Sequence, residues 1–206
     1  MGRWLYVIAD FSYGEKTIAA VLEAGVDLIQ LREKDISSAE YLMRAKKLRE
    51  MAKRFETKLV INDRLDIAAL CGADGVHLGQ SDIPVADARR FFGSGKIIGC
   101  TAKTVKQAED AMAAGADYLG SGAWFPTDTK KDATPILEET YRGILKAAPI
   151  PNVAIGGITA ENAWKPLSCG AGGLAVSAGI FQAADPVAEV RKFRSLLNSY
   201  EDGGKR

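Results

Sequence analysis

Short apolar runs alternate with longer amphipathic segments along the whole chain. Each run has about four or five residues, which is typical of a short buried strand, and the run at 59–61 contains two β-branched residues. The segments between them repeat apolar residues at helical spacing, for example over residues 38–55, 104–114 and 138–148. Eight strands are predicted, at residues 5–9, 28–32, 58–62, 75–78, 96–100, 118–121, 152–155 and 174–177.

This alternation predicts a parallel sheet, and eight strands favour a closed (β/α)8 barrel over an open doubly wound sheet. A recurring phrase supports the prediction. It first reads Ala24-Gly25-Val26-Asp27 and returns with its glycine at positions 72, 115 and 170. Glycine past a helix end is the usual left-handed cap, and copies roughly 43 to 55 residues apart leave room for about two βα units each. We therefore expect a single α/β TIM-barrel domain over residues 1–200 and a disordered tail at 201–206.

Composition narrows the class of protein. The chain has 206 residues, 47% of them hydrophobic, which suffices for one domain with a sizeable core. A net charge of +1 argues against nucleic acid or a membrane surface as the main partner. Three isolated cysteines and one histidine argue against a disulfide framework or a structural zinc site. The apolar run at residues 5–9 is too short for a signal peptide or a membrane span, so we expect a soluble cytoplasmic protein.

In such a barrel the chemistry lies where the strands end, at the C-terminal face. The third predicted strand ends at Asn62 and Asp63, and Asp82 follows the fourth after a turn. Two carboxylates at the ends of neighbouring strands suit a magnesium ion held between the protein and a substrate phosphate. Asp82 alone is equally typical of a helix cap, because Pro84 follows at an expected first helical turn. His77, inside the fourth strand, is interpreted as a packed side chain and not as a base.

Cations and a hydroxyl follow the second and fifth strands. Strand alternation places Gln30, Arg32 and Lys34 on one side if the extended geometry continues that far. An amide beside two cations suits a polyanion that carries a hydrogen-bonding ring, and the alternative is a salt-bridged strand end. Thr101 either offers its hydroxyl to a ligand or caps the next helix.

The sixth, seventh and eighth strands end in segments typical of phosphate binding. The loop at residues 120–132 combines threonines, lysines and aromatics, as a lid over a phosphate does, although an exposed turn is the alternative. Glycines at 156, 157 and 179 let backbone N–H groups approach an anion. Loops after strands seven and eight are the recurrent phosphate site of these barrels, so we expect a phosphorylated ligand.

Five motifs in this order resemble the thiamine-phosphate synthase family over nearly the whole chain. They are Gln30-Leu31-Arg32-Glu33-Lys34, Ile61-Asn62-Asp63-Arg64, Gly75-Val76-His77-Leu78-Gly79-Gln80-Ser81-Asp82, Pro126-Thr127-Asp128-Thr129-Lys130-Lys131-Asp132 and Ile155-Gly156-Gly157-Ile158. The resemblance implies a (β/α)8 transferase that joins hydroxymethylpyrimidine diphosphate to a thiazole phosphate. It also implies a dissociative substitution that releases diphosphate with the help of Mg²⁺.

The resemblance further implies a role for each matching position. Asp63 and Asp82 would hold the magnesium ion. The catalytic residues would be Arg32, Lys34, Thr101 and Lys130. The substrate-binding residues would be Gln30, Arg32, Lys34, Asn62, Thr101, Thr127, Thr129, Lys130, Gly157, Val176 and Ser177.

Two other functions remain open at this point. A thiazole tautomerase of the sister family shares the barrel and the thiazole-phosphate site but moves a proton, and it needs no diphosphate-bound metal. A non-catalytic sensor of a phosphorylated ligand would keep Gly156 and Gly157 and gain nothing from a magnesium site. The partners we expect are small-molecule substrates, with a homodimer suggested by the resemblance. Whether the thiazole is plain or carboxylated stays open.

Overall fold

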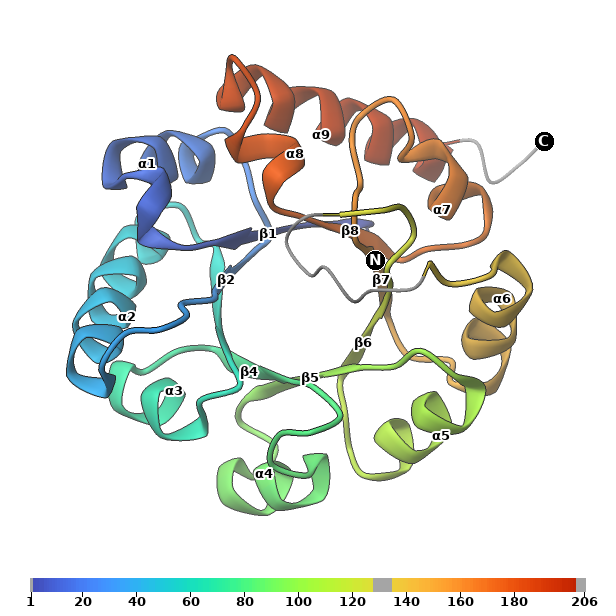
Figure 1. Cartoon of the computed structure of the whole chain (residues 1–206), viewed down its shortest axis with the longest axis horizontal. Coiled ribbons are helices and arrows are strands. Elements are labelled where there is room, and N and C mark those ends of the chain that lie inside the picture. The colour runs from blue at the N-terminus through green and yellow to red at the C-terminus, as the bar shows by residue number, and fades with distance from the viewer. Residues whose placement is uncertain (1, 128–134, 203–206) are drawn as a thin grey trace.

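A computed structural model describes residues 2–127 and 135–202 of the chain. Eight parallel strands pair in chain order and close into a barrel, because β1 also pairs with β8. Helices surround this ring on the outside (Figure 1). The predicted (β/α)8 barrel is thereby confirmed. The strands are β1 (Trp4–Ala9), β2 (Leu28–Leu31), β3 (Lys58–Asn62), β4 (Gly75–Leu78), β5 (Ile97–Thr101), β6 (Tyr118–Gly122), β7 (Asn152–Ile155) and β8 (Gly173–Val176).

Helices connect successive strands and cover the barrel. They are η1 (Phe11–Tyr13), α1 (Glu15–Glu23), α2 (Ser38–Lys53), α3 (Leu65–Cys71), α4 (Val85–Phe92), α5 (Val105–Ala113), α6 (Glu138–Ala147), α7 (Trp164–Ser168), α8 (Ala178–Phe181) and α9 (Pro186–Asp202). Two residues of the tail expected at 201–206 belong to α9, and 203–206 lie outside the described residues. Within the described part of the chain, every helix is too short or too polar to cross a membrane.

The two faces of the strands build two separate cores. Outward-facing residues such as Leu5, Ile29 and Leu59 pack against the helices in one large cluster. Inward-facing residues fill the barrel in a second, smaller cluster, which contains Tyr6, Ile8, Leu28, Val60, Tyr118, Val153 and Ala175. In a strand that is buried on both faces, the residues facing either side are apolar. These strands therefore appear in the sequence as continuous apolar runs and not as an alternation of apolar and polar residues.

The recurring glycine phrase forms the turns between helices and strands. Gly25, Gly72 and Gly115 follow α1, α3 and α5 with φ angles of +103°, +67° and +95°. Gly170 follows α7 with φ of +99°. Such angles strain any residue with a Cβ, so glycine ends each helix and turns the chain back toward the barrel.

Three aspartates of the same phrase fasten the N-terminal end of the barrel. The carboxylates accept hydrogen bonds from the first core residues of the preceding strands, namely Leu5 N to Asp27 at 2.7 Å, Leu59 N to Asp74 at 2.8 Å and Ile98 N to Asp117 at 2.7 Å. Each aspartate also pairs with an arginine of a covering helix, and the partners are Arg194, Arg49 and Arg89. A carboxylate that accepts hydrogen bonds from a backbone N–H and from an arginine links two adjacent strands to the helix that covers them.

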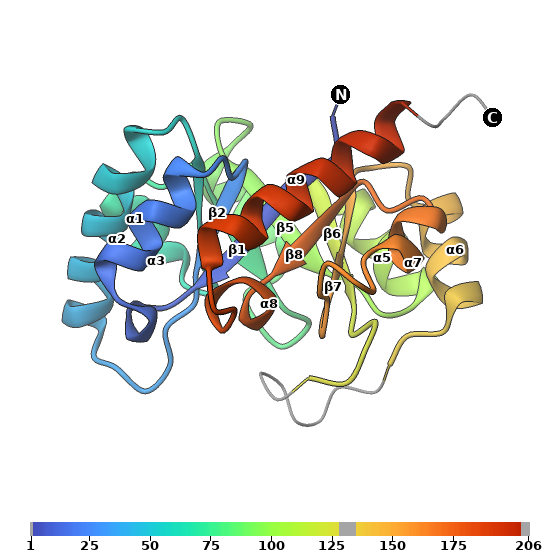
Figure 2. The same cartoon turned by 90° about the horizontal axis from the view of Figure 1, so that it is seen from above.

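The C-terminal ends of the strands meet at the opposite end of the barrel. Figure 2 shows the N-terminus at one end, and α8 with the loops that follow β6 and β7 at the other. Among the described residues, the long connections lie at this second end, whereas the turns that precede the strands are tight. The side chains that follow the strands therefore converge there.

The barrel interior leaves no room for a side chain at Gly99. A Cβ at this position would lie 2.1 Å from Cζ of Tyr118, whose ring occupies the barrel interior. We expect Gly99→Ala to lower the free energy of unfolding by about 1–3 kcal/mol through overpacking. Denaturant unfolding measures this change. Gly95→Ala is the matched control, since its Cβ would have no neighbour closer than 4.0 Å, and equal stability of the two variants would contradict the packing described here.

Candidate active site

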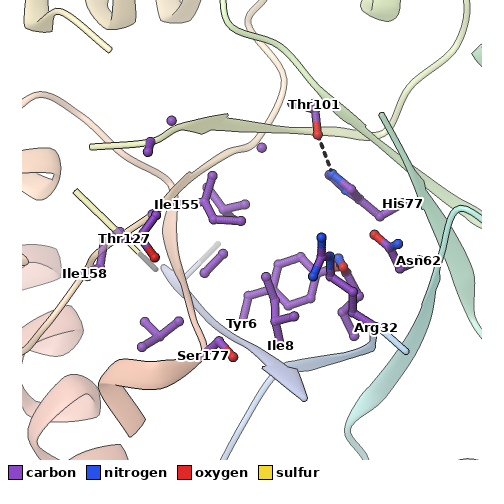
Figure 3. A pocket seen from close by; sticks show the side chains of 18 of the residues that line it. Tyr6, Ile8, Arg32, Asn62, His77, Thr101, Thr127, Ile155, Ile158 and Ser177 are labelled. Carbon is purple, nitrogen blue, oxygen red and sulfur yellow. Dashed lines mark hydrogen bonds between the residues drawn. The ribbon is translucent and has the colours of Figure 1, made fainter. Parts of the chain in front are cut away.

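A cavity of about 1120 Å³ opens at the C-terminal ends of the strands. Its lining includes ten of the residues predicted from the sequence, namely Gln30, Arg32, Asn62, Asp63, Asp82, Thr101, Thr127, Gly157, Val176 and Ser177. Figure 3 shows Arg32, Asn62, His77 and Thr101 on one side and Thr127 and Ile158 on the other. The polar groups predicted from separate strands thus share one cavity with two distinct sides.

Asp63 and Asp82 face each other in this cavity. Asp63 accepts a hydrogen bond from Asn62 Nδ2 at 2.6 Å, and Asp82 accepts one from the Gly79 backbone N–H at 2.7 Å. Burial, and then the neighbouring Asp82 carboxylate, raise the pKa of Asp63 from 3.8 to about 6. Two carboxylates that repel each other in the free protein are a donor set that a hard divalent cation would relieve.

The backbone holds Asp63 in an unusual conformation. Its φ angle is +60°, and its N–H donates to the His77 carbonyl on the adjacent strand at 2.9 Å. A non-glycine residue in the left-handed region is uncommon, although aspartate tolerates it better than most residues. The turn directs the carboxylate into the cavity immediately after β3 ends, and residues held in this way cluster at functional sites.

The structure resolves the two capping alternatives. Helix α4 begins after Pro84 and receives no side-chain cap, so Asp82 is not its cap. Helix α5 is capped by Thr104, whose hydroxyl accepts from the Gln107 N–H, so Thr101 does not cap it. Both Asp82 and Thr101 line the cavity instead.

Of the predicted cations, Arg32 lies in the cavity and Lys34 does not. Arg32 lines the cavity, and no described carboxylate lies within salt-bridge distance of it. Lys34 is exposed and does not line the cavity, because β2 ends at Leu31 and the alternation expected for 30, 32 and 34 stops there. Glu33 turns away, pairing with Arg44 at 2.9 Å. Thr129 and Lys130 lie outside the described residues.

Glycines shape the opposite side of the cavity. Gly157 has φ of +64°, and a Cβ there would lie 2.4 Å from the Pro126 carbonyl oxygen. At Gly179 a Cβ would lie 2.3 Å from the Ile158 carbonyl oxygen. Side chains are therefore excluded for steric reasons, and the loops after β6, β7 and β8 approach one another closely. Backbone groups rather than side chains form much of this wall.

Several lining residues were not predicted from the sequence. Tyr13 stacks on Phe181 with ring centroids 4.3 Å apart, and its hydroxyl lies 3.5 Å from Ser177 Oγ. Gln182 adds a polar group to the lining, and Ile8 adds an apolar one. The signal for Ile8 was available, since it lies on the inward side of β1.

A continuous line of buried polar groups crosses the floor of the cavity. Gln30 Nε2 donates to the Tyr6 hydroxyl at 2.6 Å, which lies 2.8 Å from the Tyr118 hydroxyl. Tyr118 in turn lies 3.0 Å from His77 Nδ1, and His77 Nε2 lies 3.0 Å from Thr101 Oγ1 (Figure 3). Burial lowers the pKa of His77 to about 4, so the ring is neutral near pH 7. His77 is a packed side chain, as predicted.

The sequence matches a family model over residues 5–180, and that family is described as thiamine monophosphate synthase. The chain belongs to this family. The thiamine-phosphate synthase of Methanobrevibacter smithii is 42% identical over 186 residues, which are 88% of this chain and 89% of the relative. The one from Clostridioides difficile is 44% identical over 178 residues, which are 86% and 85% of the two chains.

A solved structure agrees with these relatives. The thiamine phosphate pyrophosphorylase from Pyrococcus furiosus has a TM-score of 0.88 at 34% identity, with 96% of each chain covered. The comparisons confirm the predicted family, and with it an enzyme, a transferase of thiamine biosynthesis built on a TIM barrel. The roles of the individual residues stay predictions.

The pKa of Asp63 predicts a pH-dependent stability in the absence of metal. Because this pKa is raised to about 6, the folded state holds the proton more tightly than the unfolded state, and the protein loses stability as pH rises from about 4 through 6. Asp63→Asn removes this loss. After allowance for solvent screening, we expect the variant to be more stable than the parent by on the order of 1 kcal/mol at pH 8 and equal to it at pH 4.

Denaturant unfolding in EDTA at both pH values measures the difference. Asp87→Asn on α4 is the control, because Asp87 lies on the surface and pairs with Arg90, at the helix exterior. A difference between Asp63→Asn and the parent that is the same at pH 4 and pH 8 would show that the pKa of Asp63 is not raised in the folded protein.

Proposed function

We propose that this enzyme couples hydroxymethylpyrimidine diphosphate to a thiazole phosphate, giving thiamine phosphate and diphosphate. The carboxylate pair of Asp63 and Asp82, with Arg32 in the same cavity, is the observation that carries the proposal. A tautomerase or a sensor has no use for such a pair. The names of the related proteins support the same choice.

The residues present fit Mg²⁺ as the cofactor. Among the described residues, no cluster of three or more metal-ligating side chains is found, so the protein would supply the two carboxylates of Asp63 and Asp82. Magnesium commonly binds through one or two carboxylates and completes its shell with water and substrate phosphate oxygens. When bound, the ion would add positive charge beside the leaving diphosphate.

The reaction requires little covalent work from the protein. The bond from the pyrimidine methylene carbon to a diphosphate oxygen breaks, and diphosphate leaves with the electron pair. The aminopyrimidine delocalises the positive charge that remains, and the thiazole nitrogen then forms the new bond to that carbon. The protein must hold both rings in line and stabilise the leaving group.

One side of the cavity suits the pyrimidine diphosphate. We assign the diphosphate to Arg32 and Thr101, which line the cavity. Lys130, which lies outside the described residues, is proposed as a further cation, whereas the exposed Lys34 is left out of this assignment. Gln30 and Asn62 would face the pyrimidine ring, since their amides lie at the ends of β2 and β3 inside the barrel. Arg32 has no described anionic partner within salt-bridge distance, so an anionic ligand would satisfy it.

The other side suits the thiazole phosphate. We assign the phosphate to Gly157, Thr127, Thr129 and the backbone of Val176 and Ser177. Gly157 lines the cavity, and the neighbouring Phe125–Pro126 segment leaves no room for a side chain there. Loops after strands seven and eight bind phosphate in many barrels of this architecture. This arrangement would leave the two rings between the two anionic groups.

The first experiment measures diphosphate release from the two substrates together, with Mg²⁺ and with EDTA. We expect release that requires both substrates and the metal. A folded protein that binds thiazole phosphate yet releases no diphosphate under any of these conditions would overturn the synthase reading and favour the tautomerase or the sensor.

A variant separates the metal site from the thiazole site. We expect Asp63→Ala to reduce turnover at least about a hundredfold, because the leaving group loses its stabilisation. Thiazole-phosphate binding, measured by calorimetry, should stay nearly unchanged. Asp87→Ala on the surface of α4 is the control and should keep full turnover. Equal loss of turnover and of thiazole-phosphate binding would instead assign Asp63 to folding.

A further inference from the structure

The line of buried hydrogen bonds beneath the cavity has a direction that can be deduced from its atoms. It runs from Gln30 on β2 through Tyr6, Tyr118 and His77 to Thr101 on β5, with each link between 2.6 and 3.0 Å. Gln30, Tyr6, Tyr118 and His77 are all less than one-tenth exposed. Buried polar groups of this kind must satisfy one another, so the position of one proton constrains the rest.

Counting donors from the Gln30 end gives the direction. Gln30 Nε2 donates to the Tyr6 hydroxyl, so the Tyr6 proton has Tyr118 as its remaining described acceptor. Tyr118 accepts that proton and must pass its own to its other neighbour, His77 Nδ1. A hydroxyl has one proton to donate, so each tyrosine accepts one of these hydrogen bonds and donates the other.

The histidine transmits this direction to the ligand side. With Nδ1 as an acceptor, the neutral ring carries its proton on Nε2 and donates it to Thr101 Oγ1 at 3.0 Å. Neither ring nitrogen has a described carboxylate among its hydrogen-bond partners. The Thr101 hydroxyl accepts from the histidine and keeps its own proton for the cavity that it lines.

We propose that this chain of hydrogen bonds from Gln30 to Thr101, the relay, fixes His77 as the Nε2–H tautomer. The Thr101 hydroxyl is thereby left to donate a hydrogen bond to an acceptor-only ligand group such as a diphosphate oxygen. At the other end, the Gln30 carbonyl oxygen has no partner among the described residues and accepts from a ring amino group. The cavity therefore favours a ligand that carries a hydrogen-bond donor near Gln30 on β2 and an anionic group near Thr101 on β5. Tyr6, Tyr118 and His77 are positioning residues, and Thr101 touches the ligand.

This inference rests on the proposed function for the identity of the ligand, but the tautomer itself does not depend on it. The chain contains one histidine, so an untagged protein labelled with ¹⁵N-histidine gives the signals of a single ring. Long-range ¹H–¹⁵N correlation spectra distinguish a protonated from an unprotonated ring nitrogen. We expect Nε2 protonated and Nδ1 unprotonated in the ligand-free protein. A ring protonated on Nδ1 would overturn the proposal whatever the activity.

Two tyrosine variants then test the relay. Tyr118→Phe removes the donor to Nδ1, and we expect a shift toward the Nδ1–H tautomer with about tenfold weaker binding of inorganic diphosphate in the presence of Mg²⁺. Tyr141→Phe is the matched control, because Tyr141 is equally buried and its hydroxyl has no hydrogen-bond partner among the described residues. It should leave both the tautomer and the diphosphate affinity unchanged.

Substitutions at position 101 test the ligand end. Thr101→Val removes the hydroxyl while keeping the shape, and we expect diphosphate binding about tenfold to a hundredfold weaker, as for a lost hydrogen bond to a charged group. Thr101→Ser retains the donor and should restore binding. Full diphosphate affinity in Thr101→Val, or an unchanged tautomer in folded Tyr118→Phe, would overturn the relay.

These outcomes are distinct from a failure of the proposed function. A protein that releases no diphosphate from the two substrates, but shows the Nε2–H ring and loses diphosphate affinity in Thr101→Val, would retain the relay and lose the synthase reaction. A protein that carries out the reaction with an Nδ1–H ring would retain the function and lose the relay.

Discussion

Closure of the barrel, through the pairing of β1 with β8, is the constraint on which the rest of the structure depends. With this pairing every strand has a neighbour on both sides, and no strand exposes an unpaired edge. Closure also brings residues from opposite ends of the chain to one cavity. Arg32, Asp63, Thr101 and Ser177 belong to separate βα units and meet only because the ring is complete. The site is a property of the closed sheet, and no single segment contains it.

The two ends of the barrel use aspartate in opposite ways. At the N-terminal end, Asp27, Asp74 and Asp117 receive a backbone N–H and an arginine each, so their charges are fully compensated. At the C-terminal end, Asp63 and Asp82 face each other, and the pKa of Asp63 rises. The N-terminal aspartates therefore stabilise the barrel, while the C-terminal pair, which forms no ion pair within salt-bridge distance among the described residues, is left for a ligand. The same residue type serves both because its partners differ.

Local pattern predicted the fold, and together with the family resemblance it predicted ten of the residues that line the cavity. Apolar runs, glycine caps and polar strand ends are encoded within a few residues, so the eight strands could be predicted. Lys34 was misplaced because its prediction assumed that β2 continues, whereas the strand ends at Leu31. The floor was missed because its contacts are distant in sequence. Tyr6 and Tyr118 are 112 residues apart, and their contact depends on strand register around the ring. Periodicity carries no such information.

The pairing of Gly99 with Tyr118 has a consequence for how the pocket can change in depth. One large ring fills a layer of the interior that two medium side chains would otherwise share, and Gly99 provides the space for it. The volumes at positions 99 and 118 are therefore coupled, and the floor can be lowered or rebuilt only by exchanging both together. A library that varies these two positions jointly would sample new substrate shapes, whereas single-site libraries would mostly sample clashes and voids.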